Sequence, residues 1–136
     1  VFEGKYNTNL CKENPDSLFV FGDNVKRRGC GGQAVIRPME NTFGIATKWS
    51  PHRSNEDFFS DDNTQAMNYI LWDIEKLELL SNKRLYDKIV FPLHGFGTGL
   101  AELDVRAPKT FAFLNSLLHD RFDVSWNQEK RILEVG

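Results

Sequence analysis

The sequence predicts an α/β protein built as a three-layer sandwich, in which a mixed central sheet carries helices on both faces. Three short apolar runs have the length and composition of buried strands, and stretches with helical periodicity lie between and after them. The chain of 136 residues has the size of one domain. Because no repeat, low-complexity stretch or Pro/Ser-rich linker interrupts it, we expect a single domain over residues 1–136.

The three apolar runs are the predicted strands at the centre of the sheet. They cover residues 18–21, 43–47 and 88–93. Continuous apolar character, rather than strict alternation, is typical of strands that are covered on both faces. Residues 1–6 and 131–135 are expected to form strands at the edges of the sheet.

Two longer stretches carry apolar residues at helical spacing and are predicted to be helices. The first covers residues 61–80, and Asp61 or Asp62 is expected to cap it. The second begins near Asp104 and places Pro108 in the first turn, where proline is tolerated. A short helix after Gly32 must end by Pro38. The apolar positions are Ala66, Met67, Ile70, Leu71, Ile74, Leu77 and Leu80 in the first helix, and Ala107, Phe111, Leu114, Leu117 and Leu118 in the second.

Composition and charge argue against a nucleic-acid-binding, a zinc-binding and a membrane-spanning protein. With 17 basic and 19 acidic residues, the formal net charge is −2, which argues against a surface built for nucleic acid. Cys11 and Cys30 lack the neighbours that zinc requires, so we expect free thiols in a reducing compartment and no metal or cofactor. The apolar runs fall far short of the ~20 residues of a membrane span, and no charged leader precedes one. These observations predict a cytoplasmic protein without membrane contact.

The first of two glycine-rich loops follows the first predicted strand. Residues 21–34 read FGDNVKRRGCGGQA and lead into the predicted short helix. Glycines let backbone N–H groups approach a ligand closely, and a helix N-terminus behind them favours negative charge. The segment therefore indicates a phosphate site, although a flexible turn before a helix would show the same pattern.

The second glycine-rich loop follows the third predicted strand. Residues 93–102 read LHGFGTGLAE, and alternate glycines permit a concave row of N–H groups. In open α/β sheets the carboxyl ends of central strands share one crevice, so we expect the two loops to surround a single diphosphate. Neither loop matches the dinucleotide Gly-x-Gly-x-x-Gly fingerprint or the P-loop.

Taken together, these segments resemble the macrodomain family. Gly-Asp-Asn after the first strand, Gly-Cys-Gly-Gly-Gln-Ala, and the later Phe-Gly-Thr-Gly-Leu carry the resemblance, which covers residues 1–122 in order. It implies the macrodomain fold and the binding of ADP-ribose. Residues 45–52 are similar to the terminal ADP-ribose glycohydrolase type, in which a lysine at the strand end is the nucleophile; Lys48 holds that position here.

The resemblance also implies a set of ligand contacts. It places Gly31, Gly32 and Gln33 against the proximal ribose and phosphates, Gly95, Phe96, Gly97, Thr98 and Gly99 over the diphosphate, and Asn24 at the distal ribose. The chain departs from the family pattern at two points. Lys5 and Tyr6 follow Gly4 where an adenine-binding aspartate is usual, and Ala101 replaces an aspartate of the lysine-dependent enzymes, with Glu102 one position later.

Several single residues carry two interpretations each. Lys48 is either a neutral nucleophile or a charged partner of a phosphate. His94 either donates to a phosphate or caps the strand before it. Asn24 and Asp23 either hold ribose hydroxyls and orient a water molecule or simply form a turn. Phe96, like Trp49, either stacks on a base or ribose or packs in the core.

The sequence therefore predicts binding of ADP-ribose or a related NAD-derived nucleotide, free or attached to a macromolecule. Hydrolysis of an ADP-ribosyl bond or an ADP-ribose phosphate ester would use Lys48, Asp23 or Glu102. The alternative is a non-catalytic binding module or a sink for a signalling nucleotide, which Ala101 favours. A third reading, nucleic-acid association, rests on a basic strip that the balanced charge opposes; the strip comprises Lys26, Arg27, Arg28, Lys48 and Arg53.

Overall fold

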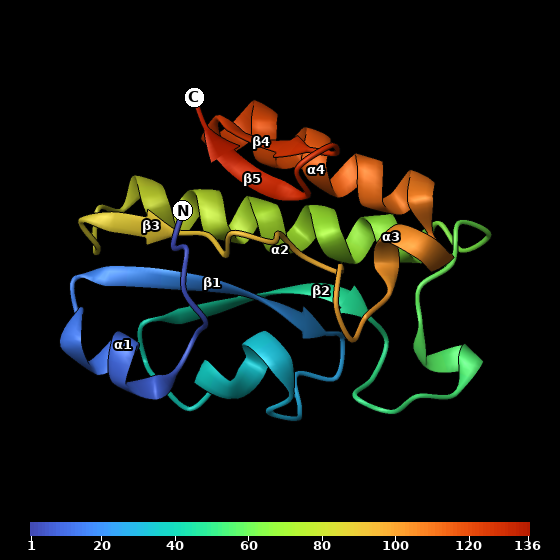
Figure 1. The fold of residues 1–136 in the computed structure, drawn as a ribbon, viewed down its shortest axis with the longest axis horizontal. Helices are drawn as coiled ribbons and strands as arrows, with labels where there is room; N and C mark the ends of the chain where they lie inside the picture. Colours follow the sequence, from blue (N-terminus) through green and yellow to red (C-terminus); the bar gives the residue numbers. More distant parts are fainter.

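A three-stranded parallel sheet forms the centre of the computed structural model, which describes residues 1–136. Its strands are β1 (Ser17–Asn24), β2 (Thr42–Lys48) and β3 (Lys88–Val90), in the order β2-β1-β3 (Figure 1). The chain passes from β1 to β2 on one side, then crosses back to β3 on the other side of β1. The connections after β1 and β3 therefore diverge at the carboxyl ends of two adjacent strands.

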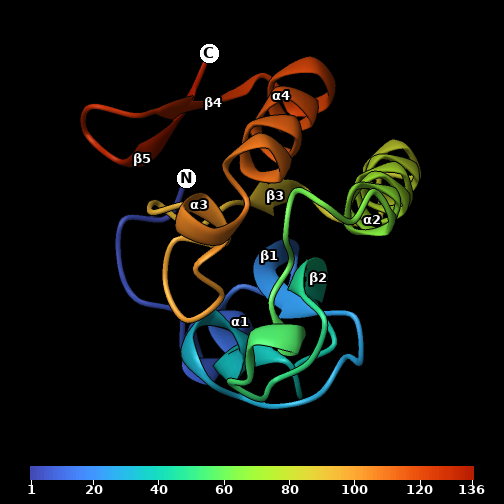
Figure 2. The ribbon, with the colours of Figure 1, turned by 90° about the vertical axis from the view of Figure 1, so that its right-hand side faces the viewer.

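Alternate side chains of β1 enter two separate cores. Leu18 and Val20 belong to the larger core, which β1 shares with α2 (Gln65–Asn82) and α4 (Pro108–Phe122). Phe19 and Phe21 belong to a smaller core shared with α1 (Thr8–Glu13) and the 3₁₀ helix η1 (Gly32–Ile36). Figure 2 shows α2 and α4 on one face of the sheet and α1 on the other. Two-sided burial explains why β1 is apolar at successive positions.

The remaining elements lie at the ends of the sheet and over α4. The 3₁₀ helix η2 (Asn55–Asp57) follows β2, and the short helix α3 (Leu103–Arg106) directly precedes α4. An antiparallel hairpin of β4 (Val124–Asn127) and β5 (Ile132–Val135) ends the chain and packs beside α4 (Figure 1). Neither of its strands joins the central sheet.

The α/β class and the three central strands are confirmed, but the sheet is parallel rather than mixed. Residues 131–135 contribute β5 to the separate hairpin instead of an edge strand. Residues 1–6 contribute a single bridge between Phe2 and Pro92, because the chain then turns inward to bury Tyr6. The Tyr6 hydroxyl donates to the carbonyl of Val20 at 2.8 Å, which draws this segment beneath the sheet.

Both long helices are confirmed, with different beginnings from those predicted. The first begins at Gln65, not near Asp61, and the second region divides at Ala107 into α3 and α4, with Pro108 in the first turn of α4. The short helix after Gly32 is η1, which ends before Pro38 as expected.

Asp61 caps a helix other than the predicted one. Its Oδ1 accepts from the backbone N–H and hydroxyl of Thr110, each at 2.9 Å, and its Oδ2 accepts from the N–H of Lys109 at 3.0 Å. These groups lie in the first turn of α4, so Asp61 joins the segment before α2 to the start of α4.

Three further observations concern membrane, thiol and metal chemistry. None of the helices combines the length and apolar character needed to cross a membrane. Cys11 is buried, Cys30 is exposed, and both are free thiols. No group of three or more metal-ligating side chains comes together in the fold.

We predict that Asp61→Ala lowers the free energy of unfolding by about 1 kcal/mol at neutral pH, because two N–H groups lose their cap. Burial acts to raise the pKa of Asp61, but hydrogen bonds from Lys109 and Thr110 lower it below its ordinary value. The stabilisation is therefore complete above the unfolded-state pKa of about 3.9 and is lost as the pH falls through the lower folded-state value. Urea unfolding at pH 7 and below pH 3 measures it, with exposed Asp62→Ala as control; equal losses in both variants at pH 7 would contradict the cap.

Candidate functional site

A cavity of about 130 Å³ lies at the carboxyl ends of β1 and β2, where the loops that follow β1 and β3 meet. In open α/β sheets, ligands bind outside the carboxyl ends of the strands where successive connections diverge. The order β2-β1-β3 places that point between β1 and β3. The cavity is lined by Gly22, Asp23, Asn24, Arg28, Gly29, Gly31, Gly32, Gln33, Ala34, Thr47, Lys48, Pro51, Gly97, Gly99, Leu100 and Ala101.

Each loop has a run of backbone N–H groups without a partner in the protein, while some of its carbonyls are occupied. Residues 29–31 and 97–101 donate no backbone hydrogen bond to any protein group. By contrast, the carbonyl of Gly29 accepts from Arg37 at 2.8 Å, and those of Gly97 and Gly99 accept from the N–H groups of Leu103 and Glu102 at 2.7 and 3.1 Å. Free donors need water or the acceptor oxygens of a ligand. Two runs of unpaired backbone donors beside one cavity favour an anion.

Two glycines allow this geometry. Gly97 has φ +80°, and a Cβ at this position would lie 2.5 Å from the Cβ of Leu103. Gly32 has φ +58°, and Leu100 from the other loop lies over it, so that a Cβ would meet its side chain at 3.5 Å. Leu100 is half exposed and spans the gap between the loops. The helices behind the loops, η1 and α3, are too short for the dipole effect that the sequence suggested, so the loop N–H groups themselves provide the donors.

Gln33 connects the two loops with its side chain. Its Oε1 accepts from the N–H of Gly22 at 2.7 Å, and its Nε2 donates to the carbonyl of Gly95 at 2.8 Å. The amide is thus engaged on both ends inside the protein. Gln33 lines the cavity as predicted, yet its side chain holds the walls together.

A network of two ion pairs, in which both carboxylates are buried, anchors the first loop. The Asp23 carboxylate, with 3% of its side chain exposed, forms a two-bonded pair with the guanidinium of Arg37. Arg27 makes the second pair with Asp73 of α2, at 2.6 and 2.8 Å, and lies 3.5 Å from Asp23. Burial acts to lower the pKa of Arg27, but hydrogen bonding to Asp73 raises it above its ordinary value. Two positive and two negative charges cancel in this network.

Asp23 is therefore a structural anchor in this arrangement, since both its oxygens already accept hydrogen bonds from the protein. Oδ1 also accepts from the N–H of Asn24 at 2.8 Å. Asn24 closes the turn that follows: its Nδ2 donates to the carbonyl of Arg28 at 2.7 Å. Both residues line the cavity and form the turn that the sequence allowed, while their contact with a ribose or a water molecule stays a prediction.

Lys48 places a buried amine at the cavity, and this amine forms no direct ion pair. Lys48 is buried at the end of β2, where its Nζ donates to the carbonyl of His52 at 2.8 Å and lies 4.2 Å from the ring centre of Phe58. Burial lowers the pKa of Lys48, and the charge of Asp57 partly opposes that shift. The amine has a single hydrogen-bond acceptor in the protein, so it can bind a further oxygen.

Glu102 lies beside the cavity rather than in its lining. Its carboxylate is half exposed and pairs with Arg106 at 3.5 Å. The guanidinium of Arg106 lies 3.8 Å from the ring centre of Phe58, the same ring that Lys48 contacts. Of the three catalytic candidates, only Lys48 combines a place in the lining with an uncompensated charge.

The four other predicted residues of the second loop contribute to its support. Phe96 is 1% exposed and packs in the larger core, as one of its two interpretations predicted. Gly95 packs against Trp126, and the Thr98 hydroxyl donates to the carbonyl of His94 at 2.7 Å. The structure thus gathers Lys48, Asp23, Asn24, Gly31, Gly32, Gln33, Gly97 and Gly99 around the cavity, and leaves Glu102, His94, Gly95, Phe96 and Thr98 outside its lining.

Sequence reasoning missed Arg37 and Asp73, the partners in the ion-pair network. One signal was present for Asp73. It lies between Ile70 and Ile74 on the apolar side of a predicted helix, and a carboxylate there must find a cation. Arg37 gives no such signal, because its partner Asp23 comes into reach only when η1 folds back beneath β1.

We predict that Arg37→Met lowers the free energy of unfolding by about 3 kcal/mol, because the buried Asp23 carboxylate loses its closest cation. Urea unfolding measures the change. The control is Arg121→Met, which removes a pair with Glu78 that is about one-third exposed on both sides and should cost less than about 1 kcal/mol. Equal costs in the two variants would contradict the anchoring role of the network.

Comparison with known proteins corrects the family expectation. A family model described as "Family of unknown function (DUF7831)" matches residues 1–117. No curated protein and no solved structure matches the chain. The macrodomain assignment is wrong, since no macrodomain family or homologue was found. Glycine loops after adjacent parallel strands follow from a general property of open sheets, which does not specify a family. The chain belongs to the family of unknown function DUF7831.

Proposed function

We propose that the cavity binds the diphosphate of a nucleotide, with ADP-ribose or a related NAD-derived nucleotide as its ligand. The observation that carries this proposal is the convergence at one cavity of two runs of free backbone N–H groups, at residues 29–31 and 97–101. Phosphate oxygens accept several hydrogen bonds at once, so they match a lining with several free donors. The carbonyls of Gly29, Gly97 and Gly99 already accept hydrogen bonds from the protein.

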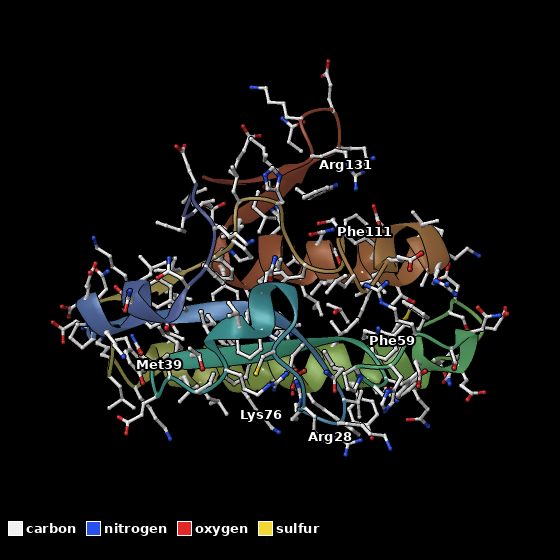
Figure 3. All side chains as sticks on the ribbon, turned by 60° about the horizontal axis from the view of Figure 1, so that its bottom comes forward. Arg28, Met39, Phe59, Lys76, Phe111 and Arg131 are labelled. Atoms are coloured by element: carbon white, nitrogen blue, oxygen red, sulfur yellow. The ribbon has the colours of Figure 1, made fainter.

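The charge of the lining supports an anionic ligand. Asp23 is its only acid, and Arg37 neutralises it. Lys48 and Arg28 remain as cations, one buried at the end of β2 and the other at the outer edge of the molecule (Figure 3). A concave site lined by one sign of charge concentrates ligands of the opposite sign.

An adjoining hollow supports a nucleotide rather than a free phosphate. It is lined in part by Tyr6, Leu93 and His94, has a volume of about 360 Å³, and shares Gly32 and Gln33 with the cavity. A ligand with its phosphates in the cavity can extend across Gly32 and place a nucleoside in this hollow. Lys5 and Tyr6 lie in its wall, together with the acidic Glu3.

Binding alone is the function that the contacts support best, because Asp23 and Glu102 are both engaged in ion pairs. Hydrolysis of an ADP-ribosyl bond is the second candidate, and the lowered pKa of Lys48 favours it. In that reaction a neutral Nζ would bond to the anomeric carbon of the distal ribose as the bond to the leaving group breaks, and the amine proton would pass to the leaving group. Water would then cleave the lysine adduct, releasing ADP-ribose and restoring the amine. Lys48→Arg would abolish turnover but not binding, and a hydride reductant added during turnover would trap the open-chain adduct as an ADP-ribosyl mass on the Lys48 peptide.

We expect calorimetry to detect ADP-ribose and pyrophosphate binding to the parent chain, with adenosine binding more weakly. Gly99→Val should abolish both anion affinities without changing the melting temperature. Nothing lies within 4 Å of a Cβ at this position, so the fold accepts the side chain, while the cavity is filled. Unchanged affinity in a folded Gly99→Val protein would place the ligand elsewhere.

The pH dependence of binding tests the role of Lys48. Because burial lowers its pKa below the ordinary 10.5, the cation is lost at a lower pH than for an exposed lysine. ADP-ribose affinity should fall by about tenfold as Lys48 loses its proton, since a hydrogen bond to a charged group is lost. Lys48→Arg keeps its charge throughout, so its affinity should stay constant from pH 7 to 10. Parallel pH profiles for the two proteins would remove Lys48 from the binding site.

A further inference from the structure

The β4–β5 hairpin contacts the second glycine loop at its beginning. The N–H of Leu133 donates to the carbonyl of Leu93 at 2.7 Å, which ties β5 to the first residue of the loop. The Trp126 ring packs against Gly95 so closely that a Cβ there would lie 2.9 Å from Cζ3. Because the Trp126 ring leaves no room for a side chain, position 95 must be glycine for the hairpin to pack here. This hairpin lies beyond residues 1–117, to which the family match extends.

Arg131, at the turn of the hairpin, contacts both ends of the same loop. Its carbonyl lies 3.3 Å from Nδ1 of His94, and its guanidinium pairs with Oδ2 of Asp104 at 2.5 Å. Figure 3 shows Arg131 at the tip of the hairpin, beyond the helix that carries Phe111. A single residue therefore joins the segment before the glycines to the segment after them.

Gln33 and the buried ring of Phe96 also hold the first half of the loop, but residues 97–101 have few contacts of their own. The loop's N–H groups from 97 to 101 have no partner in the protein, and its internal bonds are those to the carbonyls of His94, Gly97 and Gly99. A glycine-rich loop has high conformational entropy when unbound. Holding its two ends at the bound spacing reduces the ordering that a ligand must impose, which raises affinity without a new ligand contact.

We propose that Arg131 is a positioning residue for the anion cavity, setting the separation of His94 and Asp104 and with it the arrangement of the N–H groups between them. The expected effect of Arg131 on affinity rests on the proposed function. Its contacts with His94 and Asp104, which hold the two sides of the loop together, do not depend on a ligand.

The test compares Arg131→Ala, Arg131→Lys and the control Arg121→Ala, which removes the pair with Glu78 between α4 and α2. Hydrogen exchange is measured at the N–H groups of Glu102 and Leu103, which report closure of the loop, and at Val20 in β1, which reports the fold. Calorimetry with ADP-ribose measures affinity.

For Arg131→Ala we expect faster exchange at Glu102 and Leu103, unchanged exchange at Val20, and ADP-ribose affinity about three- to fivefold weaker, as expected for the loss of a partly exposed ion pair. Arg131→Lys should recover most of both effects, and Arg121→Ala should show neither. The proposal is overturned if exchange at Glu102 and Leu103 is unchanged in Arg131→Ala, or if exchange at Val20 rises equally. If the parent chain does not bind ADP-ribose, the proposed function fails, and the exchange measurements still decide whether Arg131 holds the loop.

Discussion

The pairing of the buried Asp23 carboxylate with Arg37 is the interaction on which the arrangement around the cavity depends. Besides neutralising the carboxylate, Arg37 donates to the carbonyls of Arg28 and Gly29 at 3.1 and 2.8 Å. The first loop is thus held through its carbonyls, from the protein side. Its N–H groups are left for solvent or a ligand, so the same contact that stabilises the loop also determines what it can bind.

This arrangement imposes conditions on distant parts of the chain. A Cβ at Gly44 in β2 would lie 2.4 Å from Oδ2 of Asp23, so the neighbouring strand must carry glycine beside the carboxylate. Asp73 of α2 pairs with Arg27 and also accepts from the N–H of Ala46 at 2.8 Å, which joins the helix, the sheet and the loop. Replacing one member of such a network leaves an uncompensated buried charge, which costs more than its pairing contributes.

Sequence patterns identified the elements better than the connections between them. The strands and long helices follow from apolar periodicity, a local property, and both glycine loops were placed at one cavity because parallel strands bring their carboxyl ends together. Asp61 was assigned to the wrong helix because its partners, Lys109 and Thr110, are remote in sequence. Contacts between residues that are remote in sequence produce no periodic pattern from which they could be predicted.

In the candidate site, too, the positions of residues were predictable from local patterns, whereas roles set by tertiary contacts were not. The positions of Lys48 and the cavity glycines could be predicted, since they depend on where strands end. The roles of Asp23, Gln33 and Phe96 could not, because a carboxylate, an amide or an aromatic ring in a loop serves a ligand or the fold according to its partners. The macrodomain resemblance rested mainly on the loops, and similar phosphate-binding loops occur on unrelated folds.

The most direct measurement is an amide NMR titration of the parent chain with ADP-ribose. The account predicts that the largest shifts fall on the free N–H groups of residues 29–31 and 97–101 and on the adjoining Gly32 and Gln33, with small shifts elsewhere. A larger groove of about 730 Å³, beside Phe111 and Trp126, provides the internal comparison. Shifts concentrated in that groove, or none at saturating ADP-ribose, would contradict the claim that the two loops form an anion site.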